Sequence, residues 1–192
     1  MVISWAYGVQ NSQLTGGPDW INGARFDFLA KAEGNPTTEQ MRVMLRGLLV
    51  DRFNLAVHTD TREMPVYSLS RARGDGKLGP QLAISADTKC GAPADGEVGQ
   101  RRCEFDVRPA KVHGHGVPLE LLITTLAGFT ARPVVNRTGL DAPMDFDLTW
   151  GLDANGPSIF TAVEEQLGLK LEPTRAPVGI LVIDRAEKSR ED

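Results

Sequence analysis

The predicted secondary structure of this chain has the same order of elements twice, and this repetition constrains the fold more than any other feature. Hydrophobic periodicity predicts helix, strand, helix, strand and strand in each copy. The elements of the first copy lie at residues 2–9, 25–31, 37–49, 52–58 and 64–70. Those of the second copy lie at residues 119–129, 144–150, 158–167, 167–172 and 177–183. Because unrelated segments rarely produce so many elements in matched order, we infer an internal duplication.

Glycine and proline are concentrated between the two copies and divide the chain into three parts. The first repeat covers residues 1–73, a Gly/Pro-rich insertion covers 74–117, and the second repeat covers 118–192. Each repeat would bury one face of a small sheet beneath its helices. We therefore expect an α+β protein of two tandem αβαββ repeats, with mixed or antiparallel sheets that are each covered by helices.

The end of each repeat is predicted to be a hairpin. In the first repeat the charged segment 59–63 separates the predicted strands 52–58 and 64–70, and we expect it to form an exposed turn. The last strand of the second repeat, 178–183, is apolar at nearly every position. Such a strand is expected in the centre of a sheet, covered on both faces.

Length and composition exclude several classes of protein. The 192 residues include 41% hydrophobic and 24% charged residues, values typical of a globular chain rather than a disordered or fibrous one. Lys and Arg number 21 against 25 acidic residues, which argues against a nucleic-acid partner. No apolar run reaches the roughly 20 residues of a membrane-spanning helix, so we expect no membrane insertion. Residues 1–5 do not match a signal peptide.

Six short motifs occur in an order that resembles a family of uncharacterised proteins. They are Ala6–Gly8, Gly16–Trp20, Met44–Phe53, Pro133–Leu140, Glu165–Leu171 and Val182–Asp184. With these motifs the chain is similar to the soil-associated proteins with a domain of unknown function that are common in acidobacterial genomes. The resemblance implies an exported protein, periplasmic or extracellular, with no established activity. The repeat unit also resembles the short N-terminal domains of secretins and TonB-dependent receptors, which are binding and docking modules.

Members of that family carry a signal peptide and a further strand ahead of the segment that matches Ala6–Gly8. Here Met1 falls within the corresponding helix, so we expect this chain to lack both. A missing strand would leave a sheet edge unpaired, and an unpaired edge favours pairing with a second copy. The resemblance therefore implies a homodimer through an exposed sheet edge.

Cys90 and Cys103 are the only cysteines, and 12 residues separate them within the insertion. A pair that brackets a loop suits a disulfide, and the export implied by the resemblance favours one. The alternative is two free thiols in a reducing compartment. No Cys-x-x-Cys motif is present, so neither a zinc knuckle nor a redox pair is expected.

Histidine and aspartate provide the main candidates for chemistry. His113 and His115 lie in a Gly-rich segment that we expect to be a loop, and two imidazoles at this spacing can bind one Zn²⁺. Asp145 and Asp147 share one face of a predicted strand, and with Asp141 or Asp153 they would form an oxygen-rich site suited to Ca²⁺. The alternative is that these side chains are exposed on a loop and on the solvent face of a strand, without a function.

Three aromatic residues, Trp5, Tyr7 and Trp20, are predicted to cluster around Gly16–Pro18. Aromatic side chains in such a cluster line a ligand groove when they lie at a domain edge. The alternative is an aromatic lid over a small core.

Three functions remain after these exclusions. The first is an extracytoplasmic binding or docking module for a small molecule or a protein, because no catalytic motif accompanies the repeat. The second is a hydrolase of esters or lactones, such as acyl-homoserine lactones. It would use Ca²⁺ or Zn²⁺, with His113 and His115 as candidate catalytic residues. The third is a regulatory partner of a peptidase, because members of the resembled family are sometimes fused to membrane-bound regulatory peptidases.

Overall fold

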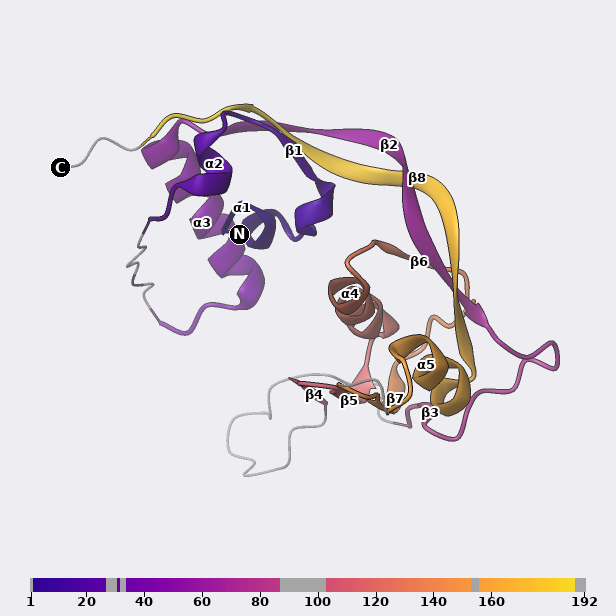
Figure 1. Cartoon of the computed structure of the whole chain (residues 1–192). Helices are drawn as coiled ribbons and strands as arrows, with labels where there is room; N and C mark the ends of the chain where they lie inside the picture. The colour runs from indigo at the N-terminus through magenta and orange to yellow at the C-terminus, as the bar shows by residue number, and fades with distance from the viewer. Residues whose placement is uncertain (1, 27–30, 32–33, 87–102, 153–155, 189–192) are drawn as a thin grey trace. The chain divides into compact units, whose positions relative to one another are not determined.

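The computed structural model of the chain describes residues 2–26, 31, 34–86, 103–152 and 156–188, and it confirms an α+β protein (Figure 1). Its helices are α1 (Val2–Tyr7), the 3₁₀ helix η1 (Asn11–Gln13), α2 (Trp20–Gly23), α3 (Thr38–Phe53), α4 (Leu119–Thr130) and α5 (Ile159–Leu167). Its strands are β1 (Leu14–Gly16), β2 (Ala56–Arg71), β3 (Leu82–Ile84), β4 (Glu104–Arg108), β5 (Lys111–Val117), β6 (Val134–Asn136), β7 (Met144–Thr149) and β8 (Leu169–Arg185). Within the described residues, no helix has the length and apolar character needed to cross a membrane.

The strands form two sheets. Sheet A has the order β1-β8-β2-β6 and is mixed, because β1 pairs with β8 and β2 pairs with β6 in parallel. The central strands β8 and β2 are antiparallel, since the start of one lies against the end of the other: His58 contacts Asp184, and Ala72 contacts Gly168. Sheet B has the order β3-β7-β5-β4 and is antiparallel throughout.

These elements fold into two compact units. Unit 1 contains residues 1–64 and 176–192, and unit 2 contains residues 65–175. Strand β2 begins in unit 1 and ends in unit 2, whereas β8 begins in unit 2 and ends in unit 1. The units therefore cut across the predicted repeats instead of following them.

The core of unit 1 is built from α1, α3 and the ends of the two long strands. Helix α3 begins with a capping box, in which Thr37 and Gln40 satisfy each other's backbone N–H groups. Toward its other end, α3 buries Leu49 and Phe53. The buried residues of this core are Ile3, Ala6, Leu49, Phe53, Leu55, Leu181 and Ile183.

The predicted position of the last strand is confirmed. Strand β8 lies between β1 and β2 in sheet A. Its neighbouring residues Ile180 and Leu181 point to opposite faces of the sheet, and both are buried. The apolar run of 178–183 therefore corresponds to a strand that is covered on both faces.

The predicted hairpins at the ends of the repeats are wrong. Residues 52–58 and 64–70 do not flank a turn, because β2 is one strand of 16 residues and the charged segment 59–63 is extended and exposed within it. Strand β8 is likewise a single strand, of 17 residues. The polar parts of β2 and β8 stay extended because the two strands are hydrogen-bonded neighbours. Their pairing satisfies the backbone N–H and C=O groups, although the side chains there are exposed. Each strand passes from one unit to the other beside a proline, Pro65 or Pro177.

In unit 2, helices α4 and α5 cover one face of sheet B. Helix α5 is capped by Ser158, whose Oγ accepts a hydrogen bond from the backbone N–H of Thr161 at 3.1 Å. The residues buried in this core are Leu69, Leu82, Val112, Val117, Leu119, Leu122, Leu126, Leu140, Met144, Phe146, Leu148, Ala162, Val163, Leu167, Leu169 and Leu171.

The described residues of the Gly/Pro-rich insertion, 74–86 and 103–117, contribute to this core. It supplies β3, β4 and β5 to sheet B, and Val112 and Val117 in β5 are buried. The expectation that His113 and His115 lie in a loop is therefore wrong. Glycine composition is misleading here, because Gly114 leaves the space that the ring of Phe146 occupies.

In the described residues, the helices and strands of each repeat follow the predicted order, except for the hairpin predicted at its end. The second repeat runs through α4, β7, α5 and β8, and the first runs through α1, α3 and β2. The strand predicted at 25–31 lies mostly outside the described residues. The internal duplication consequently stays a prediction.

Candidate functional site

Unit 1 contains a cavity of about 370 Å³ with an apolar lining. The cavity lies beside the core of unit 1, and three elements, α1, α2 and α3, contribute side chains to it. Its lining residues are Val2, Ile3, Trp20, Ile21, Ala24, Arg25, Phe26, Leu49, Phe53, Leu55 and Ala186. A volume of this size is within the range of small-molecule sites.

Three aromatic rings form one wall of the cavity. Phe53, at the end of α3, lies 6.3 Å from the ring of Trp20 in a stacked arrangement and 5.0 Å from the ring of Phe26 at an interplanar angle of 78°. Trp20 and Phe26 meet edge to face at 5.9 Å. These geometries are the favourable ones for aromatic pairs, so the rings hold one another in place.

Among the described residues that line the cavity, Arg25 is the only charged one. Its guanidinium carries a permanent positive charge, and its donors match the oxygens of a carboxylate or a phosphate. An apolar chamber with a single cation at its wall favours a ligand with an apolar body and an anionic group.

The predicted aromatic cluster is only partly brought together. Trp20 lines the cavity, whereas Trp5 and Tyr7 lie under the guanidinium groups of two α3 arginines. The distances from the guanidinium carbon to the ring centre are 5.7 Å for Arg42 over Trp5 and 5.2 Å for Arg46 over Tyr7. These are cation–π contacts that attach α1 to α3, and they give Trp5 and Tyr7 a structural role.

Sequence reasoning missed two aromatic residues of the cavity, Phe26 and Phe53. Phe53 falls in the predicted strand 52–58, whereas it is the last residue of helix α3, and Phe26 falls in the predicted strand 25–31. The signal that would have found Phe53 is its spacing from Leu49, because residues four apart lie on the same side of a helix.

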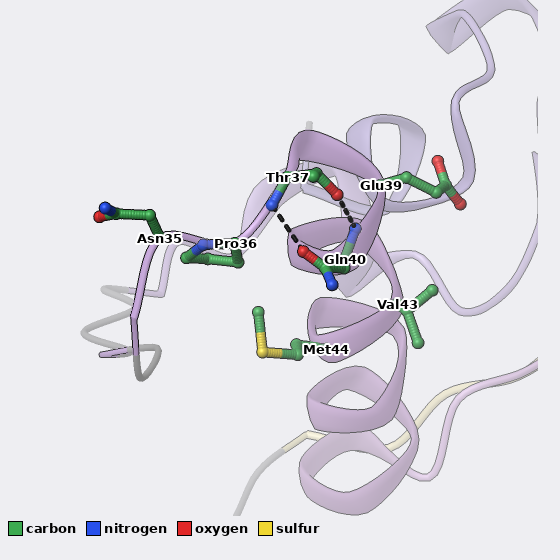
Figure 2. Close-up of a pocket in the computed structure, with 7 residues that line it drawn as sticks. All are labelled: Asn35, Pro36, Thr37, Glu39, Gln40, Val43 and Met44. Atoms are coloured by element: carbon green, nitrogen blue, oxygen red, sulfur yellow. Dashed lines mark hydrogen bonds between the residues drawn. The ribbon is translucent and has the colours of Figure 1, made fainter. Parts of the chain in front are cut away.

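A second hollow, of about 690 Å³, lies at the start of α3 and is shown in Figure 2. Asn35, Pro36 and Met44 line it together with the capping residues. The capping box uses the polar groups here: Thr37 Oγ1 accepts from the N–H of Gln40 at 3.2 Å, and Gln40 Oε1 accepts from the N–H of Thr37 at 2.7 Å (Figure 2). This hollow therefore has fewer donors to offer an anion than an uncapped helix start.

The predicted histidine and aspartate candidates do come together, on the face of sheet B opposite to the helices. His113 lies across from Asp147 in the register of β5 and β7, with Nδ1 3.0 Å from Oδ1. His115 Nδ1 lies 3.0 Å from Asp145 Oδ1. Both pairs line one hollow of about 280 Å³. Asp141, one of the two alternatives for the third metal ligand, is exposed before β7 and does not line this hollow. Asp153, the other alternative, lies outside the described residues.

The carboxylate of Asp145 is held in its charged form. Burial alone would raise its pKa, but hydrogen bonds from Ser85, from the backbone N–H of Gly116 at 2.7 Å and from His115 outweigh burial and lower the pKa below its usual value. Asp145 thus receives hydrogen bonds from both Ser85 and His115. In a catalytic triad the serine hydroxyl contacts the imidazole, and the carboxylate contacts the other nitrogen of that ring. Here the serine contacts the carboxylate instead, so Ser85, His115 and Asp145 do not form a triad.

The described residues contain no group of three or more His, Cys, Asp or Glu side chains arranged to hold a metal ion. Asp145 and Asp147 are instead each engaged with a histidine. Calcium needs six to eight oxygen ligands, and the set of Asp141, Asp145 and Asp147 is not assembled. Cys90 lies outside the described residues, and Cys103 is partly buried against the core of unit 2. The disulfide between them stays a prediction.

These features define a two-unit α+β protein with an aromatic cavity in one unit and paired histidines and aspartates in the other. The chain belongs to the family described as protein of unknown function DUF3738, whose model matches residues 1–186. This match confirms membership of an uncharacterised family. Export, a soil source and the likeness to secretin and TonB-dependent receptor domains stay expectations. No curated protein and no solved structure matches the chain.

Proposed function

We propose that this protein is a binding module for a small molecule with an apolar body and an anionic head. The observation that carries the proposal is the apolar cavity of unit 1, with its three aromatic rings and with Arg25 as the one charged residue in the described lining. Transfer of apolar ligand surface from water into such a cavity is favourable by about 25 cal/mol per Å². The already packed rings reduce the entropy cost of binding.

The charge of Arg25 selects the class of ligand. A carboxylate or sulfonate on the ligand would accept hydrogen bonds from the guanidinium, whereas an ammonium group would be repelled. The apolar residues supply affinity without specificity for a particular head group. Arg25 therefore accounts for the preference for an anion, and an acyl chain with a terminal carboxylate is the simplest molecule of this class.

The compartment and the third expected function rest on resemblance alone. An exported protein would meet its ligand in the periplasm or outside the cell, which is our proposal for its location. A role as regulatory partner of a peptidase would place the ligand-binding cavity in a larger assembly. Neither proposal changes the chemistry of the cavity.

A second candidate function, metal-assisted hydrolysis of an ester or lactone, is favoured by the hollow on sheet B that His113 and His115 line. A metal ion bound to His113 and His115 would polarise the carbonyl and activate water. This function depends on metal binding, which is a separate question from ligand binding in unit 1. Substitutions that line the cavity of unit 1 test ligand binding, whereas substitutions of His113 or His115 in unit 2 test hydrolysis.

The proposal is tested by calorimetric titration with decanoate and with 1-decanol, which share an apolar chain and differ in the head group. Ala24→Phe places a ring in the cavity and is expected to abolish binding of both molecules. Arg25→Gln is expected to weaken decanoate about tenfold, as for the loss of one charge-assisted hydrogen bond, and to leave decanol unchanged.

The matched control is Val50→Phe, which enlarges an exposed side chain of α3 that does not line the cavity. This variant should bind decanoate as the parent protein does. Equal affinity of Ala24→Phe and the parent, with both proteins folded by circular dichroism, would contradict the proposal.

A further inference from the structure

His113 and His115 are arranged as a chelating pair. Residues two apart in a strand point to the same side of the sheet, and their Cα atoms are about 6.6 Å apart. The shared side is established by their partners, because Asp147 and Asp145 also lie two apart in β7. Two imidazoles at this spacing can turn their rings toward one metal ion.

The contacts of the two rings fix which atom faces an ion. In both histidines Nδ1 is bonded to a carboxylate, at 3.0 Å. The ring atom directed away from that carboxylate is Nε2. A carboxylate that accepts a hydrogen bond from one ring nitrogen orients the imidazole and makes the other nitrogen a better metal ligand. Asp145 and Asp147 would therefore act as positioning residues, not as ligands.

The surroundings of the pair suit a cation. The side chains of His113 and His115 are 32% and 42% exposed and line the same hollow, so an ion can reach both. Strand β4 places Glu104 opposite His115 and Asp106 opposite His113. Each histidine consequently lies between two carboxylates in the sheet, one on each neighbouring strand. Arg108 and Lys111 supply two positive charges on the same face, against four negative ones.

We propose that His113 and His115 together bind one divalent transition-metal ion, with Cu²⁺ preferred over Ni²⁺ and Zn²⁺. Imidazole nitrogen is a ligand for these ions, and the order of preference follows the Irving–Williams series. Calcium and magnesium require oxygen ligands and are expected not to bind here. Water molecules would complete the coordination. This site is independent of the cavity in unit 1.

The test is calorimetric titration of the whole chain with Cu²⁺, Zn²⁺ and Ca²⁺ at neutral pH, with the Cu²⁺ visible spectrum as a second measurement. One Cu²⁺ per chain is expected, and His113→Ala and His115→Ala should each weaken it by more than tenfold, since a chelate loses a ligand. Asp147→Asn keeps both rings and is expected to weaken Cu²⁺ about tenfold.

The matched control is His58→Ala. His58 also has Nδ1 bonded to a carboxylate, at 2.8 Å from Asp184, but it has no second histidine two residues away. This variant should bind Cu²⁺ as the parent protein does. Loss of Cu²⁺ binding in His58→Ala, or parent-like affinity in both His113→Ala and His115→Ala, would overturn the proposal. Unfolding curves of every variant show whether a loss reflects the site or the fold.

Discussion

Gly114 lies directly beneath the ring of Phe146, in the middle of sheet B. The two residues are opposite each other in the register of β5 and β7, and a Cβ atom on Gly114 would overlap the ring. Phe146 is buried on the side of the sheet that α4 and α5 cover. Because side chains alternate along a strand, His113 and His115 lie on the opposite face of the sheet, where they meet Asp147 and Asp145.

Gly114→Ala is therefore expected to destabilise the protein by about 1–3 kcal/mol, the usual cost of overpacking a core. Urea unfolding followed by circular dichroism measures this. Gly47→Ala is the matched control, because Gly47 lies in α3 with no atom near its missing Cβ. That substitution should raise the free energy of unfolding by about 0.5–1 kcal/mol, since alanine favours helix. A Gly114→Ala protein as stable as the parent would refute the role of Phe146.

Phe53→Ala removes a buried ring that contacts both Trp20 and Phe26, and it should lower the free energy of unfolding by about 3–5 kcal/mol. Thermal or urea unfolding provides the measurement. Val50→Ala, on the exposed side of the same helix, should change it by less than about 0.5 kcal/mol. Similar losses in the two variants would mean that Phe53 is not a core residue.

The lowered pKa of Asp145 predicts a pH dependence of stability. A carboxyl group whose pKa is lower in the folded state stabilises the fold above its unfolded pKa, and this stabilisation disappears as the pH falls through the folded pKa. Asp145→Asn should therefore be less stable than the parent at about pH 6, and the difference should shrink below about pH 4. Urea unfolding across this range tests the prediction, with Asp141→Asn as a control of equal charge change. A difference that is constant with pH would contradict it.

The cysteine pair predicts a covalent bond in protein that has been exported to an oxidising compartment. Mass spectrometry of peptides under non-reducing conditions should recover the segment with Cys90 joined to the segment with Cys103. Closure of a loop of this length is expected to stabilise the fold by about 3 kcal/mol, so Cys103→Ser should unfold at a lower temperature. Two free thiols in periplasmic protein would contradict the pairing.

Much of the fold follows from local patterns in the sequence. Helices α3 and α5 follow directly after Thr37 and Ser158, whose side chains cap them as the residue types predict. The apolar run 178–183 predicts a central strand, because a strand buried on both faces has apolar residues at successive positions. The position of β8 between β1 and β2 confirms this prediction. A helix cap and an apolar run each depend only on residues within or next to one element, so both can be recognised from the local sequence.

The long strands were not predictable in the same way. The charged residues 59–63 have the composition of a turn, and they remain extended only because a distant segment, β8, pairs with β2. The candidate sites show the same division. The sequence predicted a loop for His113 and His115 and one face of a strand for Asp145 and Asp147, and only the register of β5 and β7 brings the two pairs together.

The binding of an anionic apolar ligand in unit 1 is tested most directly by nuclear magnetic resonance with isotope-labelled protein and decanoate. The amide signals of Ile21, Leu49 and Leu55 should shift on titration, because these residues line the cavity. Signals of sheet B, such as those of Val112 and Leu148, should stay in place. Shifts confined to sheet B, or none at saturating decanoate, would contradict the assignment of the cavity as the ligand site.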